Sequence, residues 1–146
     1  MLRSNFGLLL GLDGREVPNY ERFRLGGNRN FGPYQGLRGY DDLEVVPAGN
    51  PAFLGGQATS VFTTELVYPF GPKVHGVLFF DAGNTWNSFR EADPSLLRKG
   101  AGIGVRVEVP MLGQLGLDYG YGFDRIDRLG RDRDGWNLHF NFGSLF

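Results

Sequence analysis

The segment Trp136–Phe146 alternates between apolar and polar side chains, and this period of two constrains the fold more than any other feature. Successive side chains of a β-strand point to opposite faces, so the segment has one apolar and one polar face. On a water-soluble protein such an edge strand is prone to aggregation. In a membrane β-barrel, the apolar face meets lipid. The segment therefore predicts a barrel strand whose apolar face holds Trp136, Leu138, Phe140, Phe142 and Phe146.

Five further segments show the same period, whereas helical periodicity is almost absent. Each is about as long as the roughly 9–11 residues that a tilted strand needs to cross a bilayer, and no apolar run approaches the ~18 residues of a membrane helix. The N-terminus superficially resembles a signal peptide, but Gly7 and Gly11 disfavour a helix and the alternation favours a strand. The predicted strands lie at residues 2–12, 58–69, 74–86, 97–109, 114–123 and 136–146.

The predicted strands are joined by connections that alternate between short and long. Residues 71–73 and 110–113 form short turns, whereas residues 13–57, 87–96 and 124–135 form long connections. Outer-membrane barrels show this alternation, with short periplasmic turns and longer outside loops. The sequence thus predicts an all-β, antiparallel transmembrane β-barrel with its C-terminus on the periplasmic side.

A soluble sandwich or a lipocalin-like barrel is the alternative fold, because its apolar face would point inward. Two features favour the membrane. The polar faces of the strands are rich in glycine and carry arginine and carboxylates together, which suits a polar lumen. Aromatic residues lie near strand ends on the apolar faces, as in interfacial girdles: Tyr68, Trp86, Phe123, Trp136 and Phe146.

Six strands are fewer than the roughly eight of the smallest bacterial outer-membrane barrels. An open sheet in lipid would leave unpaired backbone groups, each of which costs several kcal/mol. Either residues 13–57 contain further strands, or the chain is a fragment of a larger barrel, or several copies assemble. We expect a fragment.

The long connection 13–57 carries a sequence pattern that resembles a known family. Its run Leu37-Arg38-Gly39-Tyr40 is similar to the Arg-Gly-aromatic loop motif of the BamA-type outer-membrane assembly barrels, also called bacterial surface antigen proteins. Further matches follow in the family's order: Gly26-Gly27, Glu65-Leu66 with Pro69, Phe79–Asn84 with Trp86, Gly100–Gly104 and the terminal Phe146. The resemblance implies that residues 1–146 form the C-terminal portion of a sixteen-stranded barrel whose long loop folds into the lumen.

The resemblance also implies that Arg38 contacts acidic residues of the inner wall, here Glu65 and Asp81. The residue pattern agrees, because both acids fall on the polar faces of adjacent strands about 4.8 Å apart, within reach of one guanidinium fork. In a wet lumen such pairs contribute only about 1 kcal/mol, so we expect them to fix the loop's position. Gly39 would allow close backbone approach, and Tyr40 would pack against the wall. The alternative is a solvated loop arginine.

By resemblance, the predicted function is the folding and insertion of other β-barrels in the outer membrane. A lateral seam would open, and a client strand would add to the exposed edge of strand 136–146 by β-augmentation. The expected partners are outer-membrane lipid, unfolded barrel clients and accessory lipoproteins. A secretion barrel of the same superfamily, for two-partner secretion or autotransporter assembly, is the main alternative. A passive porin-like barrel and a soluble β protein remain further classes.

The sequence offers little to support an enzyme, a cofactor or a metal site. There is no cysteine, and His75 and His139 lack metal-site spacing and are expected to line the lumen. Gly100–Gly104 resembles a phosphate loop but lies within a predicted strand. Asp132–Gly135 lacks the remaining ligands of a calcium loop. The 15 basic and 16 acidic residues nearly balance, and without a basic patch we expect no nucleic-acid partner.

Overall fold

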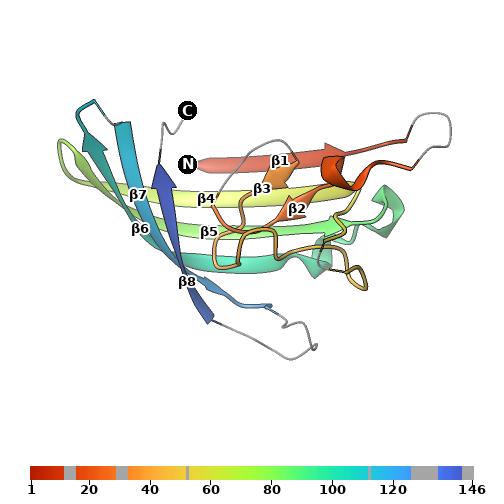
Figure 1. Ribbon diagram of the computed structural model, residues 1–146. Coiled ribbons are helices and arrows are strands. Elements are labelled where there is room, and N and C mark those ends of the chain that lie inside the picture. The colour runs from red at the N-terminus through yellow and green to blue at the C-terminus, as the bar shows by residue number, and fades with distance from the viewer. Residues whose placement is uncertain (12–15, 29–32, 52, 112, 126–134, 143–146) are drawn as a thin grey trace.

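The computed structural model describes residues 1–11, 16–28, 33–51, 53–111, 113–125 and 135–142. Its main element is one six-stranded antiparallel sheet in the order β1-β4-β5-β6-β7-β8 (Figure 1). The strands are β1 (Leu2–Leu8), β4 (Ala58–Gly71), β5 (Val74–Trp86), β6 (Arg98–Val109), β7 (Gly113–Gly122) and β8 (Gly135–Phe142). Within the described parts of the connections lie three short 3₁₀ helices: η2 (Asn19–Glu21), η3 (Phe89–Glu91) and η4 (Pro94–Leu96). Across the described ranges, no helix has the length and apolar character that a membrane crossing requires.

All six predicted strands are confirmed, and consecutive strands of the sheet pair antiparallel, as an antiparallel barrel requires. The N-terminal segment is a strand, but β1 ends at Leu8 instead of residue 12. The amide of Leu9 still donates to the Gln57 carbonyl at 2.7 Å, so pairing with the chain before β4 continues for one residue. β8 ends at Phe142, and residues 143–146, with the predicted Phe146, lie outside the described residues.

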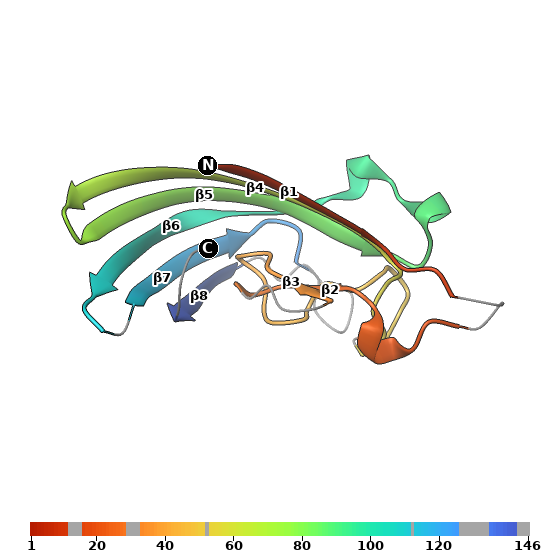
Figure 2. The ribbon, with the colours of Figure 1, turned by 90° about the horizontal axis from the view of Figure 1, so that it is seen from above.

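The sheet is strongly curved and is not closed. Figure 2 shows it arching over the long loop, which lies on the concave side. Within the described ranges the loop adds no strand to the sheet, because β2 (Arg24–Leu25) and β3 (Tyr34–Gln35) form a separate parallel pair. β1 and β8 are therefore the two edges of the sheet. This arrangement is consistent with part of a larger β-barrel.

The two faces of the sheet have opposite character, as the alternation predicts. The convex face exposes large apolar side chains from every strand, including Phe6, Leu66, Leu78, Ile103, Leu117 and Leu138. Of the residues predicted for the aromatic girdle, Tyr68, Phe123 and Trp136 are exposed, as a contact with lipid requires. The prediction is wrong for Trp86, which is only 8% exposed.

The loop covers part of the concave face and has an apolar core of its own. Leu25, Leu37, Tyr40 and Val45 pack together with Val61 of β4, and each is at most 3% exposed. The backbone supports this core, because Leu25 and Val45 exchange hydrogen bonds of 3.1 and 2.9 Å. The loop is therefore a folded element that is docked on the inner wall.

Candidate functional site: the contact of the loop with the inner wall

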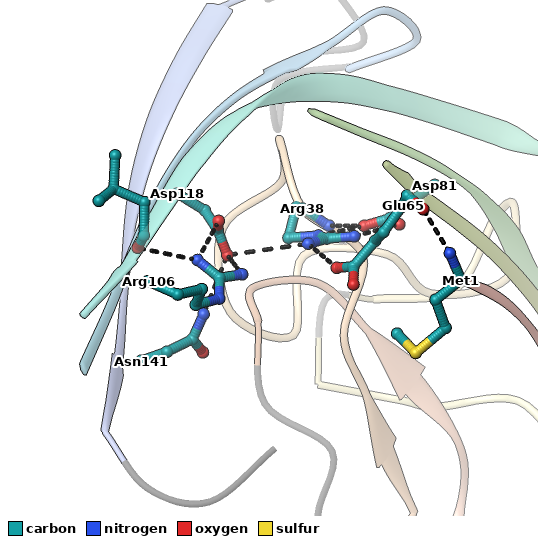
Figure 3. A network of polar contacts seen from close by, with 8 residues as sticks. Met1, Arg38, Glu65, Asp81, Arg106, Asp118 and Asn141 are labelled. Atoms are coloured by element: carbon teal, nitrogen blue, oxygen red, sulfur yellow. Dashed lines mark hydrogen bonds and ion pairs between the residues drawn. The ribbon is translucent and has the colours of Figure 1, made fainter. Parts of the chain in front are cut away.

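Arg38 occupies the centre of the contact between the loop and the wall (Figure 3). Its Nε and Nη2 donate to the two carboxylate oxygens of Asp81 at 2.7 and 2.8 Å, and its main-chain amide donates to the same carboxylate at 3.1 Å. Its Nη1 donates to Glu65 Oε1 at 2.5 Å. One arginine therefore joins the loop to β4 and β5 simultaneously, through the two acids predicted as its partners.

Strand register places the two acids on one face. Asp81 lies opposite Thr63, and Glu65 lies opposite Phe79, so the acids are diagonal neighbours across β4 and β5. Diagonal neighbours are about 7–8 Å apart, a span that a guanidinium fork can bridge. The centroid of the Phe79 ring, on the same face of β5, lies 3.8 Å from Arg38 Cζ, in the geometry of a cation–π contact.

The expectation that the ion pair lies in a wet lumen is wrong, because the loop itself excludes water from the site. Arg38 is 6% exposed and Asp81 is 2% exposed. Burial lowers the pKa of Arg38, but the hydrogen bond and charge of Asp81, with the charges of Glu65 and Asp118, outweigh it and raise that pKa above its ordinary value. Removing one partner of such a buried pair typically costs about 3–5 kcal/mol.

A third acid, Asp118 of β7, extends the network and was not predicted. Its Oδ2 lies 3.8 Å from Arg38 Nη1, and both of its oxygens accept from Arg106 of β6, at 2.7 and 2.8 Å. Asp118 is fully buried. Sequence offered a signal for this pair, because Arg106 and Asp118 fall on the predicted polar faces of adjacent strands.

Glycines of the wall make room for the loop backbone. A Cβ added at Gly100 of β6 would collide with the carbonyl oxygen of Arg38, and one at Gly120 of β7 would lie 2.9 Å from the Gly39 nitrogen. Gly39 has a φ of +97°, and its own Cβ would lie 2.8 Å from backbone atoms of Tyr121 and Gly122. The loop and wall therefore touch backbone to backbone, which accounts for glycines on both sides.

Tyr40 and Leu37 complete the motif by packing inward, and both have no exposed surface. The Tyr40 hydroxyl donates to the Lys99 carbonyl at 2.9 Å and accepts from the Asp124 amide at 3.3 Å. Burial raises the pKa of this hydroxyl to about 12. The side chain therefore attaches the loop to the wall near the start of β6 and the end of β7.

A second arginine holds the loop from the opposite direction. Arg125, which follows β7, donates to Glu44 Oε1 at 3.0 Å and to Asp41 Oδ2 at 2.9 Å, both on the loop. Arg38 thus reaches from the loop to wall acids, while Arg125 reaches from the wall side to loop acids. The strand pattern gave no signal for Arg125, because it lies in a connection outside the alternating segments.

The predicted residues of the terminal strand divide by face. Trp136, Leu138, Phe140 and Phe142 point outward with exposed fractions of 53–66%. On the inward face, His139 is 8% exposed and accepts a hydrogen bond from the loop, so it lines the concave side as predicted. The site as a whole therefore holds a loop by ion pairs and hydrogen bonds.

Comparison with known protein families agrees with this architecture. The sequence matches the family model of the Omp85 superfamily domain over residues 1–146. Members of this superfamily are outer-membrane proteins of β-barrel type, with roles in the assembly or secretion of other proteins. Because the match spans the whole sequence, the chain belongs to the Omp85 superfamily.

Proposed function

We propose that this chain acts in the assembly branch of the superfamily, as a BamA-like barrel that folds and inserts β-barrel clients into the outer membrane. The observation that carries the proposal is the edge of β8. β8 pairs with β7 along Gly135–Gly122 to Phe142–Leu115, and within the described sheet it has no neighbour on its other side. A client strand would add to this edge by β-augmentation, and no covalent chemistry is required.

The outward face of β8 supports a location in outer-membrane lipid. Trp136 stacks on Tyr119 of β7 with ring centroids 4.6 Å apart, and both rings are exposed on the convex face. Backbone groups unpaired in lipid each cost several kcal/mol. A free strand edge in the bilayer therefore favours any incoming strand that satisfies those groups, which is the driving force of the proposed insertion.

Arg38, Glu65 and Asp81 would keep the loop docked on the inner wall during this work. Unfolded barrel proteins are the proposed clients, and accessory lipoproteins, expected from the resemblance, are proposed partners. Polypeptide secretion through the same barrel is the competing function, in which the loop would yield to a substrate passing through the lumen.

The test uses the full-length protein in its native host, with the chromosomal copy depleted. Arg38→Ala should lower the amount of folded barrel proteins in the outer membrane, since Asp81 and Glu65 lose their cation. The charge-reversed pair Arg38→Asp with Asp81→Arg should partly restore it. Arg90→Ala, at an exposed arginine of η3, is the matched control and should leave it unchanged.

One result would contradict the role of the loop contact, and another would contradict the assembly function. Normal levels of folded barrel proteins in Arg38→Ala would remove the loop contact from the mechanism. Normal barrel proteins after depletion, together with lost export of a soluble passenger, would assign the chain to secretion.

A further inference from the structure

We propose that the loop is latched to β8 through the peptide groups of Gly39, and that this latch couples the loop's position to the mobility of β8. The latch consists of Gly39 on the loop with His139 and Asn137 on β8. The coupling to client insertion rests on the proposed function of the β8 edge, whereas the latch itself is a property of the fold. His139 and Asn137 are thus positioning residues.

The geometry of the latch uses both polar groups of one glycine. The Gly39 amide donates to His139 Nε2 at 3.1 Å, so this ring nitrogen acts as acceptor and carries no proton. The Gly39 carbonyl accepts from Asn137 Nδ2 at 3.4 Å, and the same nitrogen donates to Asp41 Oδ1 at 3.0 Å. Asn137 and His139 are two residues apart, so one face of β8 presents both side chains to one residue of the loop.

Neighbouring groups fix the orientation of these side chains. Arg125 Nη1 donates to Asn137 Oδ1 at 3.2 Å, which leaves the Asn137 amide nitrogen directed at the loop. Gly39 is buried, and a buried amide without an acceptor is unfavourable. His139 supplies that acceptor. The latch is therefore a specific set of contacts.

The next inward residue of β8 joins the same network. Asn141 Nδ2 donates to Asp118 Oδ2 at 2.9 Å, and this oxygen lies 3.8 Å from Arg38 Nη1. Figure 3 shows Asn141, Asp118 and Arg38 in one network of polar contacts, with Arg106 beside them. The three inward side chains of β8, at positions 137, 139 and 141, therefore all contact either the loop or an acid beside Arg38.

These contacts matter because β8 is an edge strand. Its backbone is held by β7 alone within the described sheet, so the loop provides a second attachment through its side chains. While the loop is docked, β8 is restrained from both β7 and the lumen side. Displacement of the loop removes one of these restraints. Because coupling between two sites is reciprocal, a client strand that binds and shifts β8 also changes how stably the loop is docked.

The test measures the position of β8 directly. The printed sequence contains no cysteine, so Leu138→Cys on β8 and Leu66→Cys on β4 place spin labels on two outward, exposed positions away from the loop and four strands apart, about 19 Å at 4.8 Å per strand. Double electron–electron resonance on the full-length protein in lipid nanodiscs gives the distribution of distances between the two labels. Asn137→Ala with His139→Ala should at least double its width. His139→Gln, which keeps an acceptor, should broaden it less than His139→Ala does.

His75→Ala is the matched control. It removes the other histidine, on β5, whose Nδ1 is buried without a hydrogen-bond partner among the described residues. It should leave the distribution narrow. Each single substitution is measured as well, so that a double variant that does not fold leaves the latch testable, and each should give an intermediate width.

The outcomes separate the latch from the proposed function. Equal widths in the latch variants and in His75→Ala would overturn the latch, whatever the activity. A broadened distance distribution in the latch variants supports the latch. If client insertion then stays normal, the coupling of β8 to assembly is overturned while the latch stands.

Discussion

At the scale of single residues, the site depends on what one arginine can do that other side chains cannot. Arg38 directs its guanidinium at Asp81 and Glu65 and its Cζ at the Phe79 ring. A guanidinium offers five donors in a rigid plane, whereas a lysine offers a compact point charge. A positive charge at position 38 without the planar guanidinium therefore does not reproduce the contacts with Asp81, Glu65 and Phe79.

Replacement of Arg38 should separate the effects of charge and geometry. Arg38→Ala should lower the free energy of unfolding by about 3–5 kcal/mol, because it leaves buried carboxylates unpaired. Arg38→Lys should fall between Ala and wild type, since it keeps the charge and loses the fork. Urea unfolding of the barrel in lipid vesicles measures this. If Arg38→Ala lowers the free energy of unfolding no more than Arg90→Ala does, the buried contact of Arg38 with Asp81 and Glu65 does not stabilise the barrel, which would contradict the account.

Gly39 provides a test of the close approach of loop and wall. Gly39→Ala should lower the free energy of unfolding through strain at φ +97° and through the clash with Tyr121 and Gly122. Gly49→Ala is the matched control, because Gly49 also has a positive φ (+82°) but has no atom near its added Cβ. Strain at such a φ costs about 1–3 kcal/mol and is common to both. An equal loss of stability in both variants would show that the loop does not touch the wall there.

Because of Tyr40, the free energy of unfolding of the barrel should decrease at alkaline pH. The unfolded chain ionises its tyrosines near pH 10, whereas folded Tyr40 keeps its proton until about pH 12. Between these values the unfolded state binds fewer protons, so stability falls as the pH rises from about 10 to 12. The tyrosinate absorbance of the folded wild type minus that of Tyr40→Phe should have its midpoint near pH 12. A midpoint near 10 would place Tyr40 in water.

At the scale of elements, the sequence predicted the strands and left the interior of the loop open. Alternation is a local property, so β4 to β8 and their faces followed from it. The loop core of Leu25, Leu37, Tyr40 and Val45 has no period, because its residues meet through folding-back of the chain. Arg125 was missed because it lies outside the alternating segments and its loop partners are more than 80 residues away. Asp118 lies on a predicted polar face beside Arg106, so its ion pair could have been predicted, whereas its approach to Arg38 depends on the folding-back of the loop. The low exposure of Trp86 likewise could not be read from its position in a strand.

The outward face of β8 gives a prediction at this scale. With Trp86→Phe, and with any tryptophan outside residues 1–146 also replaced by Phe, Trp136 should be strongly quenched by brominated lipid, because it is 53% exposed on the convex face. With Trp136→Phe, the remaining Trp86 should be quenched weakly, since it is 8% exposed. Fluorescence in vesicles of each variant measures this. Quenching of Trp136 by a water-soluble quencher instead of by lipid would point to a soluble sheet.

At the scale of the whole molecule, the curved sheet has an apolar convex face, a concave face partly covered by a docked loop, and an edge at β8. The first two features explain how the chain is stabilised. The third links the fold to the proposed activity, because an edge strand in lipid has unpaired backbone groups that an incoming strand can satisfy. The hydrogen bonds between the loop and β8 connect the position of that edge to the docking of the loop in the lumen.

The central claim is that clients add to the edge of β8, and crosslinking tests it most directly. A photoreactive amino acid at Leu138 of the full-length protein in living cells should crosslink to the terminal strands of newly made barrel proteins. The same group at Leu66 of β4, an outward residue of an internal strand, is the control and should crosslink to lipid. Client adducts at Leu138 alone are the predicted result. Lipid adducts at both positions, with no client at either, would contradict the account.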